Sequence, residues 1–139
     1  MTLTVEEAKA ILAPILASYD EWLAKGDVDG VSSLYSPDGV LVHKGNNCAH
    51  GRDQIKHALV PFAIPTESTA SIILFLFLLA QTPFHITNHH YEATSDHIIF
   101  HAVFSSKVIA TCAVFGGKFE TIYRKEGDQW LIIFDEFQA

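Results

Sequence analysis

The hydrophobic periodicity of this chain changes once, at Pro83, and that change constrains the fold more than any other feature. Before Pro83, apolar residues recur at the three- and four-residue spacing of amphipathic helices. After it, apolar and polar residues alternate in segments rich in Val, Ile, Phe, Tyr and Thr, which is typical of strands. Helices followed by hairpin-connected strands predict an α+β fold, with N-terminal helices packed on one face of a strongly curved antiparallel sheet. A length of 139 residues suits one such domain, 1–139.

The first helix is predicted to begin at Thr4, which forms a capping-box pattern with Glu7. Pro14 lies inside this helix, so a kink or a break is expected there. Gly26 provides the stop signal. Between the cap and the stop, apolar residues form one helical stripe: Ile11, Leu12, Ile15, Leu16, Tyr19, Trp22 and Leu23.

Two shorter helices follow in the first half of the chain. Asp27 can cap a helix over residues 28–35, and residues 52–60 have the pattern of a third helix. The sequence Ser-Pro-Asp-Gly at 36–39 predicts a turn, in which Asp38 has a structural role. Residues 45–51 are predicted to form a loop.

Five segments are predicted to be strands, and the turns between the later ones are short. Ser95-Asp96 and residues 126–128 have the composition of hairpin turns, which makes the C-terminal half an antiparallel meander. The predicted strands are 40–44, 84–94, 97–106, 111–125 and 129–138.

The segment 64–82 interrupts this pattern with a strongly apolar sequence. Its central run, residues 72–80, reads IILFLFLLA, which is too short to cross a bilayer as a helix. Pro65 and Pro83 bracket the segment, and its composition favours a helix that is apolar on all sides. Such a helix could plug the mouth of the domain, form a dimer contact or dip into a membrane surface. Translated non-coding sequence is a further alternative for this segment.

Charge and cysteine content restrict the partners and the compartment. The net charge is −7, and Lys and Arg form no cluster, so a nucleic-acid partner is not expected. The N-terminal sequence MTLTVEEAKA lacks the basic and apolar regions of a signal peptide. Cys48 and Cys112 are expected to be free thiols, which favours the reducing cytoplasm.

Three local motifs resemble one known superfamily. They are YDEWLAKGDVDGVSSLYSPDGVLVH from Tyr19 to His43, GRDQI at 51–55, and FETIYRKEGDQWLIIFDE at 119–136. In this order they are similar to the nuclear transport factor 2-like domains, which include ketosteroid isomerases and polyketide cyclases of the SnoaL type. The resemblance covers about 120 residues outside the hydrophobic segment. It implies a cone-shaped α+β fold with an apolar pocket between the first helix and the sheet.

The isomerase branch of this superfamily implies roles for two residues. Tyr19 aligns with the tyrosine that donates a hydrogen bond to the oxyanion, and His43 aligns with the aspartate that acts as the base. A neutral carboxylic acid completes the isomerase site. The strand expected to supply it offers only Glu120, whose register is undetermined from the sequence.

A histidine in place of the aspartate is chemically reasonable, because imidazole titrates close to neutral pH. The sequence therefore predicts a domain that binds a small apolar organic ligand, with Tyr19 and His43 as catalytic residues of an isomerase or lyase. Trp22, Phe119 and Asp135 are the candidate ligand contacts. No cofactor is expected.

The same residues also allow a non-catalytic interpretation. Tyr19 lies on the apolar stripe of its helix and could be a core residue, and His43 could be a structural histidine. Asp135 and Glu136 are adjacent on a strand, so one of them must face inward or toward a partner, and an acid that reaches His43 could orient its ring. The alternative function is an interaction or scaffold module that forms a homodimer through its sheet.

The chain contains eight histidines, which prompts a search for metal ligands. No metal-binding motif is present. A two-residue turn at 95–96 would place His90 opposite His101, with Glu92 on the same face of the sheet. We predict no metal site, and interpret these residues as a polar pocket wall or an exposed strip.

Overall fold

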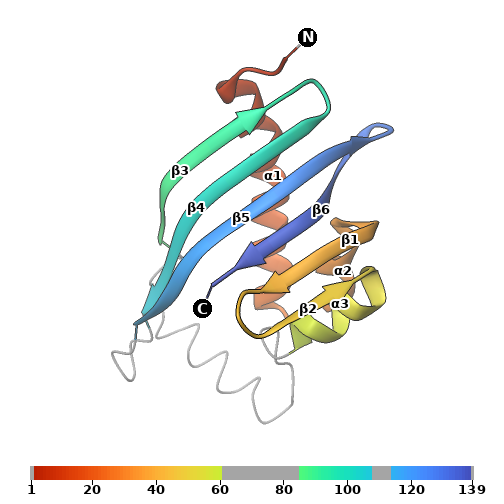
Figure 1. The fold of residues 1–139 in the computed structure, drawn as a ribbon, viewed down its shortest axis with the longest axis vertical. Helices are drawn as coiled ribbons and strands as arrows, with labels where there is room; N and C mark the ends of the chain where they lie inside the picture. The colour runs from red at the N-terminus through yellow and green to blue at the C-terminus, as the bar shows by residue number, and fades with distance from the viewer. Residues whose placement is uncertain (1, 61–84, 108–113, 139) are drawn as a thin grey trace.

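The computed structural model describes residues 2–60, 85–107 and 114–138 of the chain. Figure 1 shows a twisted sheet with the described helices on one of its faces. This arrangement confirms the predicted α+β class. The hydrophobic segment 64–82 and Cys112 lie outside the described residues, so the predictions for them stay predictions.

The first helix, α1 (Val5–Ala24), begins with the predicted capping box. The backbone nitrogen of Thr4 donates to Glu7 Oε2 over 2.7 Å, and the backbone nitrogen of Glu7 donates to Thr4 Oγ1 over 3.2 Å. The helix is not broken at Pro14. Pro14 and Ala10 are both exposed, so water can satisfy the carbonyl that loses its helical partner to the proline ring.

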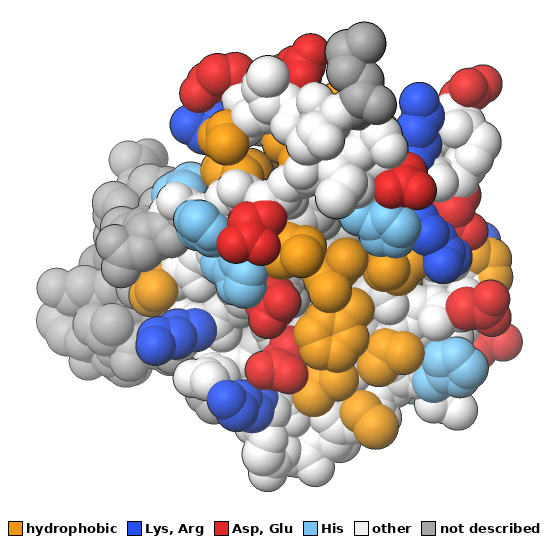
Figure 2. All heavy atoms as spheres, turned by 45° about the horizontal axis from the view of Figure 1, so that its top comes forward, with side chains coloured by type: hydrophobic (Ala, Val, Ile, Leu, Met, Phe, Trp, Pro, Cys, Tyr) orange, Lys and Arg blue, Asp and Glu red, His pale blue; other side chains and the backbone are white. Residues whose placement is uncertain are grey.

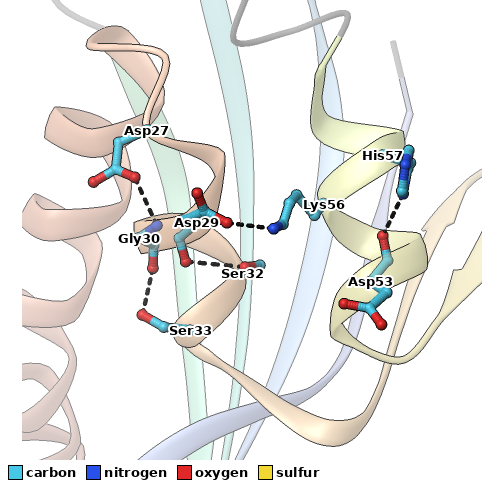
Figure 3. Close-up of polar contacts among 8 residues, drawn as sticks. All are labelled: Asp27, Asp29, Gly30, Ser32, Ser33, Asp53, Lys56 and His57. Atoms are coloured by element: carbon cyan, nitrogen blue, oxygen red, sulfur yellow. Dashed lines mark hydrogen bonds and ion pairs between the residues drawn. The ribbon is translucent and has the colours of Figure 1, made fainter.

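The second helix, α2 (Val28–Ser33), is shorter than predicted. Asp27 caps it by accepting a hydrogen bond from the backbone nitrogen of Gly30 over 2.8 Å (Figure 3). The helix ends before residue 35 because the chain already joins the sheet there. The carbonyl of Leu34 accepts a hydrogen bond from the backbone nitrogen of Ile132 over 2.9 Å.

The third helix, α3 (Arg52–Leu59), agrees with the prediction to within one residue. An ion pair between Lys56 and Asp29 joins it to α2, as Figure 3 shows. In its first turn, Arg52 Nε donates to the carbonyl of Tyr35 over 2.8 Å. These two contacts hold the short helices against the start of the first strand.

The sheet has six strands in the order β2-β1-β6-β5-β4-β3. Strand β1 is parallel to β6, and the other neighbouring pairs are antiparallel, so the sheet predicted as antiparallel contains one parallel pair. The strands are β1 (Tyr35–His43), β2 (Asn47–His50), β3 (His85–Ala93), β4 (His97–Lys107), β5 (Val114–Glu126) and β6 (Gln129–Phe137).

Strand β2 and the first part of β1 correct two sequence predictions. Residues 47–50, predicted as loop, form an edge strand because they pair with β1 through a tight connection after His43. The turn predicted at 36–39 is a bulge inside β1. The register shifts between Tyr35, which pairs with Ile132, and Val40, which pairs with Phe134.

Gly39 is required at this bulge. A Cβ atom at this position would lie 2.9 Å from the carbonyl oxygen of Ile132 and 3.0 Å from that of Ser36, closer than carbon and oxygen can normally approach. The bulge therefore depends on close packing of backbone against backbone. It allows Tyr35 to enter the core ahead of the regular part of β1.

The core lies between α1 and the sheet. Its fully buried members come from both layers and include Leu12 of α1, Tyr35 of β1, Phe100 of β4, Tyr123 of β5 and Ile132 of β6. Side chains alternate along each strand, so the neighbours of these residues point away from the helices. Figure 1 shows the opposite face of the sheet in front, without a described helix on it.

Within the described part of the chain, no helix is both long enough and apolar enough to span a bilayer. Cys48 on β2 is an exposed free thiol.

Candidate functional site

Four side chains form a hydrogen-bonded chain on the helix side of the sheet. The hydroxyl oxygens of Tyr19 and Tyr35 lie 3.0 Å apart, and Tyr35 donates to Asp135 Oδ2 over 2.7 Å. Thr121 donates to the other carboxylate oxygen, Oδ1, over 3.2 Å. The chain therefore links α1, β1, β6 and β5 through one carboxylate.

Helix periodicity, the bulge in β1 and the pairing of β5 with β6 explain why these four residues meet. Tyr19 belongs to the apolar stripe of α1, which faces the sheet. Tyr35 precedes the bulge of β1, where Arg52 holds its carbonyl. Thr121 lies directly opposite Asp135 in the β5–β6 register, so their side chains share one face.

Burial controls the protonation of this site. Asp135 is only 8% exposed, and burial raises the pKa of its carboxyl to about 6, although the hydrogen bonds from Tyr35 and Thr121 oppose the rise. Burial also raises the pKa of the Tyr35 hydroxyl well above its ordinary value, and the nearby carboxylate and Tyr19 add to this effect. Tyr35 therefore stays protonated, whereas Asp135 changes its charge close to neutral pH.

His43 lies on the same face of the sheet, one row further along the strands. The register pairs Leu41 with Asp135 and His43 with Phe137. The His43 ring stacks on Phe137, with ring centroids 4.6 Å apart and planes at 13°. Its Nδ1 atom lies 3.3 Å from Nδ2 of Asn46, in the connection to β2.

The two predicted aromatic ligand contacts have different surroundings. Phe119 pairs with Phe137 in the sheet register, which places it in the same row as His43. Its ring meets that of Phe100 edge-on, with centroids 5.4 Å apart. Trp22 packs instead toward α2, where a Cβ on Gly30 would lie 3.0 Å from its indole.

Glu120, the only acid that its strand offered for the third carboxyl, does not face the site. Thr121, its neighbour, is the residue that faces the site, so Glu120 points to the opposite side of the sheet. There its Oε1 atom lies 3.9 Å from Nε2 of His101. The buried carboxyl comes from β6 instead, as Asp135.

Sequence reasoning missed Tyr35 and Thr121. The sequence predicts Tyr35 at the end of a helix, whereas its inward position depends on the bulge that follows it. Thr121 could have been found only by fixing the register of the last hairpin against Asp135. A symmetric hairpin about the predicted turn at 126–128 would pair Thr121 with Ile133, and only the irregularity between Ile122 and Tyr123 brings Thr121 opposite Asp135.

The predicted pairing of His90 with His101 is confirmed. The two rings have centroids 5.8 Å apart, and His90 Nε2 lies 3.1 Å from Glu92 Oε1. Nevertheless, the described residues contain no group of three His, Cys, Asp or Glu side chains placed to hold a metal ion.

Comparisons with known proteins agree with this architecture. No protein-family model matches the sequence, and no curated protein matches it. Among solved structures, an NTF2-like protein of unknown function from Pseudomonas putida matches with a TM-score of 0.74 at 14% identity. The match covers 99% of this chain and 89% of that protein. This chain has the nuclear transport factor 2-like fold.

Two further structures with this fold have functional names. A "Putative Scytalone Dehydratase" from Novosphingobium aromaticivorans matches with a TM-score of 0.68 at 16% identity, covering 93% of this chain and 81% of that one. A "Putative calcium/calmodulin dependent protein kinase II association domain" from Xanthomonas campestris matches with a TM-score of 0.62 at 21% identity, covering 92% and 84%. At these identities the likeness establishes the fold, and function must be argued from the site.

Proposed function

We propose that this domain binds a small organic ligand with a carbonyl oxygen between α1 and the sheet, and that it catalyses proton transfer next to that carbonyl. The observation that carries the proposal is the buried chain from Tyr19 through Tyr35 to Asp135. A buried hydrogen-bonded network of this kind holds its hydroxyl groups in fixed positions. Tyr19 is the member of the network that α1 supplies, and His43 lies on the same face of the sheet, one row from Asp135.

The charge of Asp135 sets the direction of the hydrogen bonds. When Asp135 is ionised it accepts the proton of Tyr35, and the Tyr35 oxygen then accepts that of Tyr19. When Asp135 is protonated it can donate to Tyr35, which then donates to Tyr19. Only in the second state does Tyr19 direct its own proton outside the chain, toward a ligand oxygen.

The proposed chemistry uses His43 as the base. A ring nitrogen of His43 takes a proton from the carbon next to the carbonyl, and the electron pair of that C–H bond forms a carbon–carbon double bond. The carbonyl oxygen becomes an enolate oxygen that accepts a hydrogen bond from Tyr19. The imidazolium then returns the proton to another carbon, which is isomerisation, or to a departing hydroxyl, which is dehydration.

Deuterium exchange into a panel of small ketones tests this function. Tyr19→Phe and His43→Ala should each lower the exchange rate by about 100-fold or more, which is the usual contribution of such groups. His57→Ala is the control, because His57 is exposed on α3. Equal exchange rates in the wild type and in both site variants would exclude catalysis.

Binding of phenolates tests the direction of the hydrogen-bonded chain. A phenolate resembles an enolate, and its affinity should fall as the pH rises through about 6, where Asp135 loses its proton. Tyr35→Phe interrupts the chain and should flatten this pH dependence. A wild-type affinity that does not change across that pH range would contradict the proposed role of Asp135.

A second candidate function is an interaction module, and one observation favours it. The face of the sheet opposite α1 contains a row of apolar side chains from four adjacent strands: Val40, Phe134, Ile122 and Ile99. We propose that the domain forms a homodimer through this face.

The exposed thiol of Cys48 supports a reducing compartment such as the cytoplasm.

A further inference from the structure

The helix-free face of the sheet is organised as parallel rows that run across the strands. We call the row of Val40, Phe134, Ile122 and Ile99 the apolar row. All four residues are half-buried, and Figure 2 shows hydrophobic side chains gathered in the middle of this face. A continuous apolar surface of this kind on an otherwise charged face is typical of a binding surface.

On one side of the apolar row lies an acidic row. Glu136 is directly opposite Glu120 in the β5–β6 register, and Glu120 is opposite His101 in the β4–β5 register. Like charges directly opposite one another destabilise a sheet. Glu120 is 39% exposed, and the nearest imidazole nitrogen, that of His101, is 3.9 Å away. The fold therefore holds two repelling carboxylates at the edge of an apolar surface.

On the other side of the apolar row lies a basic position. Arg124 pairs with His97 across the β4–β5 register and with Leu131 across β5–β6. It is 39% exposed and forms an ion pair with Glu126 of its own strand, with 3.3 Å between Nη2 and Oε1. A guanidinium has five N–H donors in a fork, so this ion pair leaves donors for a second carboxylate.

A twofold rotation makes these rows complementary to the same rows of a second copy of the chain. When two copies pack face to face with a twofold axis along the apolar row, the strands of the two sheets run antiparallel. The apolar row then meets the apolar row, and the rows on either side exchange places. The acidic row of each copy lies over Arg124 of the other. Aligned sheets pack about 10 Å apart, which Arg and Glu side chains can span together.

We propose that a second copy of this chain docks on the helix-free face in this orientation, with Arg124 of each copy bound to Glu120 and Glu136 of the other. The inference rests on the homodimer proposed above and specifies its contacts. The partner's guanidinium would neutralise the two repelling carboxylates, which explains why they lie at the border of the apolar row. The same contact would be formed twice in each dimer.

A charge-swap experiment on the full chain tests this orientation. Arg124→Glu in both copies would place carboxylate against carboxylate, and Glu120→Arg with Glu136→Arg would place guanidinium against guanidinium. Each variant alone should therefore be monomeric, with its dimer dissociation constant raised at least about 30-fold. An equimolar mixture restores opposite charges at both contacts, so it should form a heterodimer. Light scattering and native mass spectrometry distinguish these species.

Lys125→Glu is the matched control, because it makes the same change of charge at the next residue of β5, on the other face of the sheet. It should leave the dimer intact, and circular dichroism should show that every variant is folded. If the double arginine variant fails to fold, Glu120→Gln with Glu136→Gln replaces it. Those changes relieve the repulsion within one chain, so the fold should be at least as stable while the dimer is weaker.

Different outcomes would overturn the homodimer itself and the orientation proposed for it. A wild-type chain that is monomeric at all concentrations overturns both the homodimer and its orientation. A dimer whose dissociation constant is unchanged by Arg124→Glu would overturn the orientation alone. So would a mixture of the two variants that stays monomeric although both are folded. Ketone exchange by the monomeric variants would still test the catalytic site, since Tyr19 and His43 belong to the opposite face.

Discussion

Asp135 and Glu136 are adjacent acids on one strand, but they lie on opposite faces of the sheet and differ in burial and in neighbours. Asp135 faces α1, is almost fully buried and receives hydrogen bonds from Tyr35 and Thr121. Glu136 faces away from the helices, is half-exposed and lies opposite another carboxylate, Glu120. The comparison shows that the chemistry of a strand residue depends first on which face it occupies. One face favours a proton-dependent site, and the other favours a charged contact surface.

Aromatic residues on the two faces should differ most in their contribution to stability. Tyr35→Ala should lower the free energy of unfolding by about 3–5 kcal/mol, because it empties a fully buried site and removes the donor to Asp135. Phe134→Ala, on the half-buried outer face, should cost about 1–2 kcal/mol in the monomer. Urea denaturation at a concentration below dimer formation measures both. Equal losses would contradict the difference in burial between the faces.

The two acids should differ next in the pH dependence of stability. The folded pKa of Asp135 is about 6 and its unfolded value is 3.8, so the folded state holds the proton more tightly. The stabilisation from this group is complete below pH 3.8 and is lost as the pH rises through 6. Relative to Asp135→Asn, the wild type should lose on the order of 2–3 kcal/mol between pH 4 and pH 7.

Glu136→Gln provides the matched comparison for this pH effect. It should leave the fall in stability between pH 4 and pH 7 in place, because the titrating group is Asp135. Thermal unfolding in buffers across this range measures the difference between the two variants. A wild type and Asp135→Asn that respond identically to pH would show that burial does not control this carboxyl.

Thr121→Val should have a smaller effect, confined to the helix side. The substitution keeps the shape of the side chain and removes the hydroxyl that donates to Asp135 Oδ1. We expect a loss of about 1–2 kcal/mol in the free energy of unfolding at pH 7, where Asp135 is ionised. At pH 4 the loss should shrink, since a neutral carboxyl gains less from the donor. A loss that is equal at both pH values would argue against a charge-dependent bond.

The smallest effect is expected on the outer face, and its sign is reversed. Glu120→Gln removes one of two opposed carboxylates and should raise the free energy of unfolding of the monomer by about 0.2–0.5 kcal/mol. Added salt should reduce this gain, because it screens exposed charges. Destabilisation by Glu120→Gln would indicate that its contact with His101 matters more than the repulsion from Glu136.

Much of the fold could be predicted from local patterns. The capping box of Thr4 and Glu7, the cap at Asp27, and the opposition of His90 and His101 depend on short-range geometry, and the structure has all three. The predictions failed where the local pattern is too short or the partner strand is distant. Strand β2 has only four residues, and the parallel pairing of β1 with β6 joins segments far apart in the sequence.

The residues of the candidate site also divide into those that the sequence indicated and those that only the structure showed. The family resemblance indicated Tyr19 and His43, and the strand pattern indicated Asp135. The structure places all three on the helix side of the sheet. The sequence left the register of Glu120 open, and the structure places this residue on the opposite face, since a shift of one residue reverses the face of a strand residue. Tyr35 was missed because its inward position depends on a bulge and on the contact from Arg52.

The sequence by itself predicted the three described helices and strands β3 to β6, because helical and strand periodicity are properties of neighbouring residues. It also determined that Asp135 and Glu136 lie on opposite faces of the sheet, so that one of them faces the core or a partner. Only the tertiary structure decided which of them does, because that depends on how β5 and β6 align. The alignment joins Thr121, Asp135, Tyr35 and Tyr19 into one hydrogen-bonded chain, and it leaves Glu136 and Glu120 facing each other on the other side.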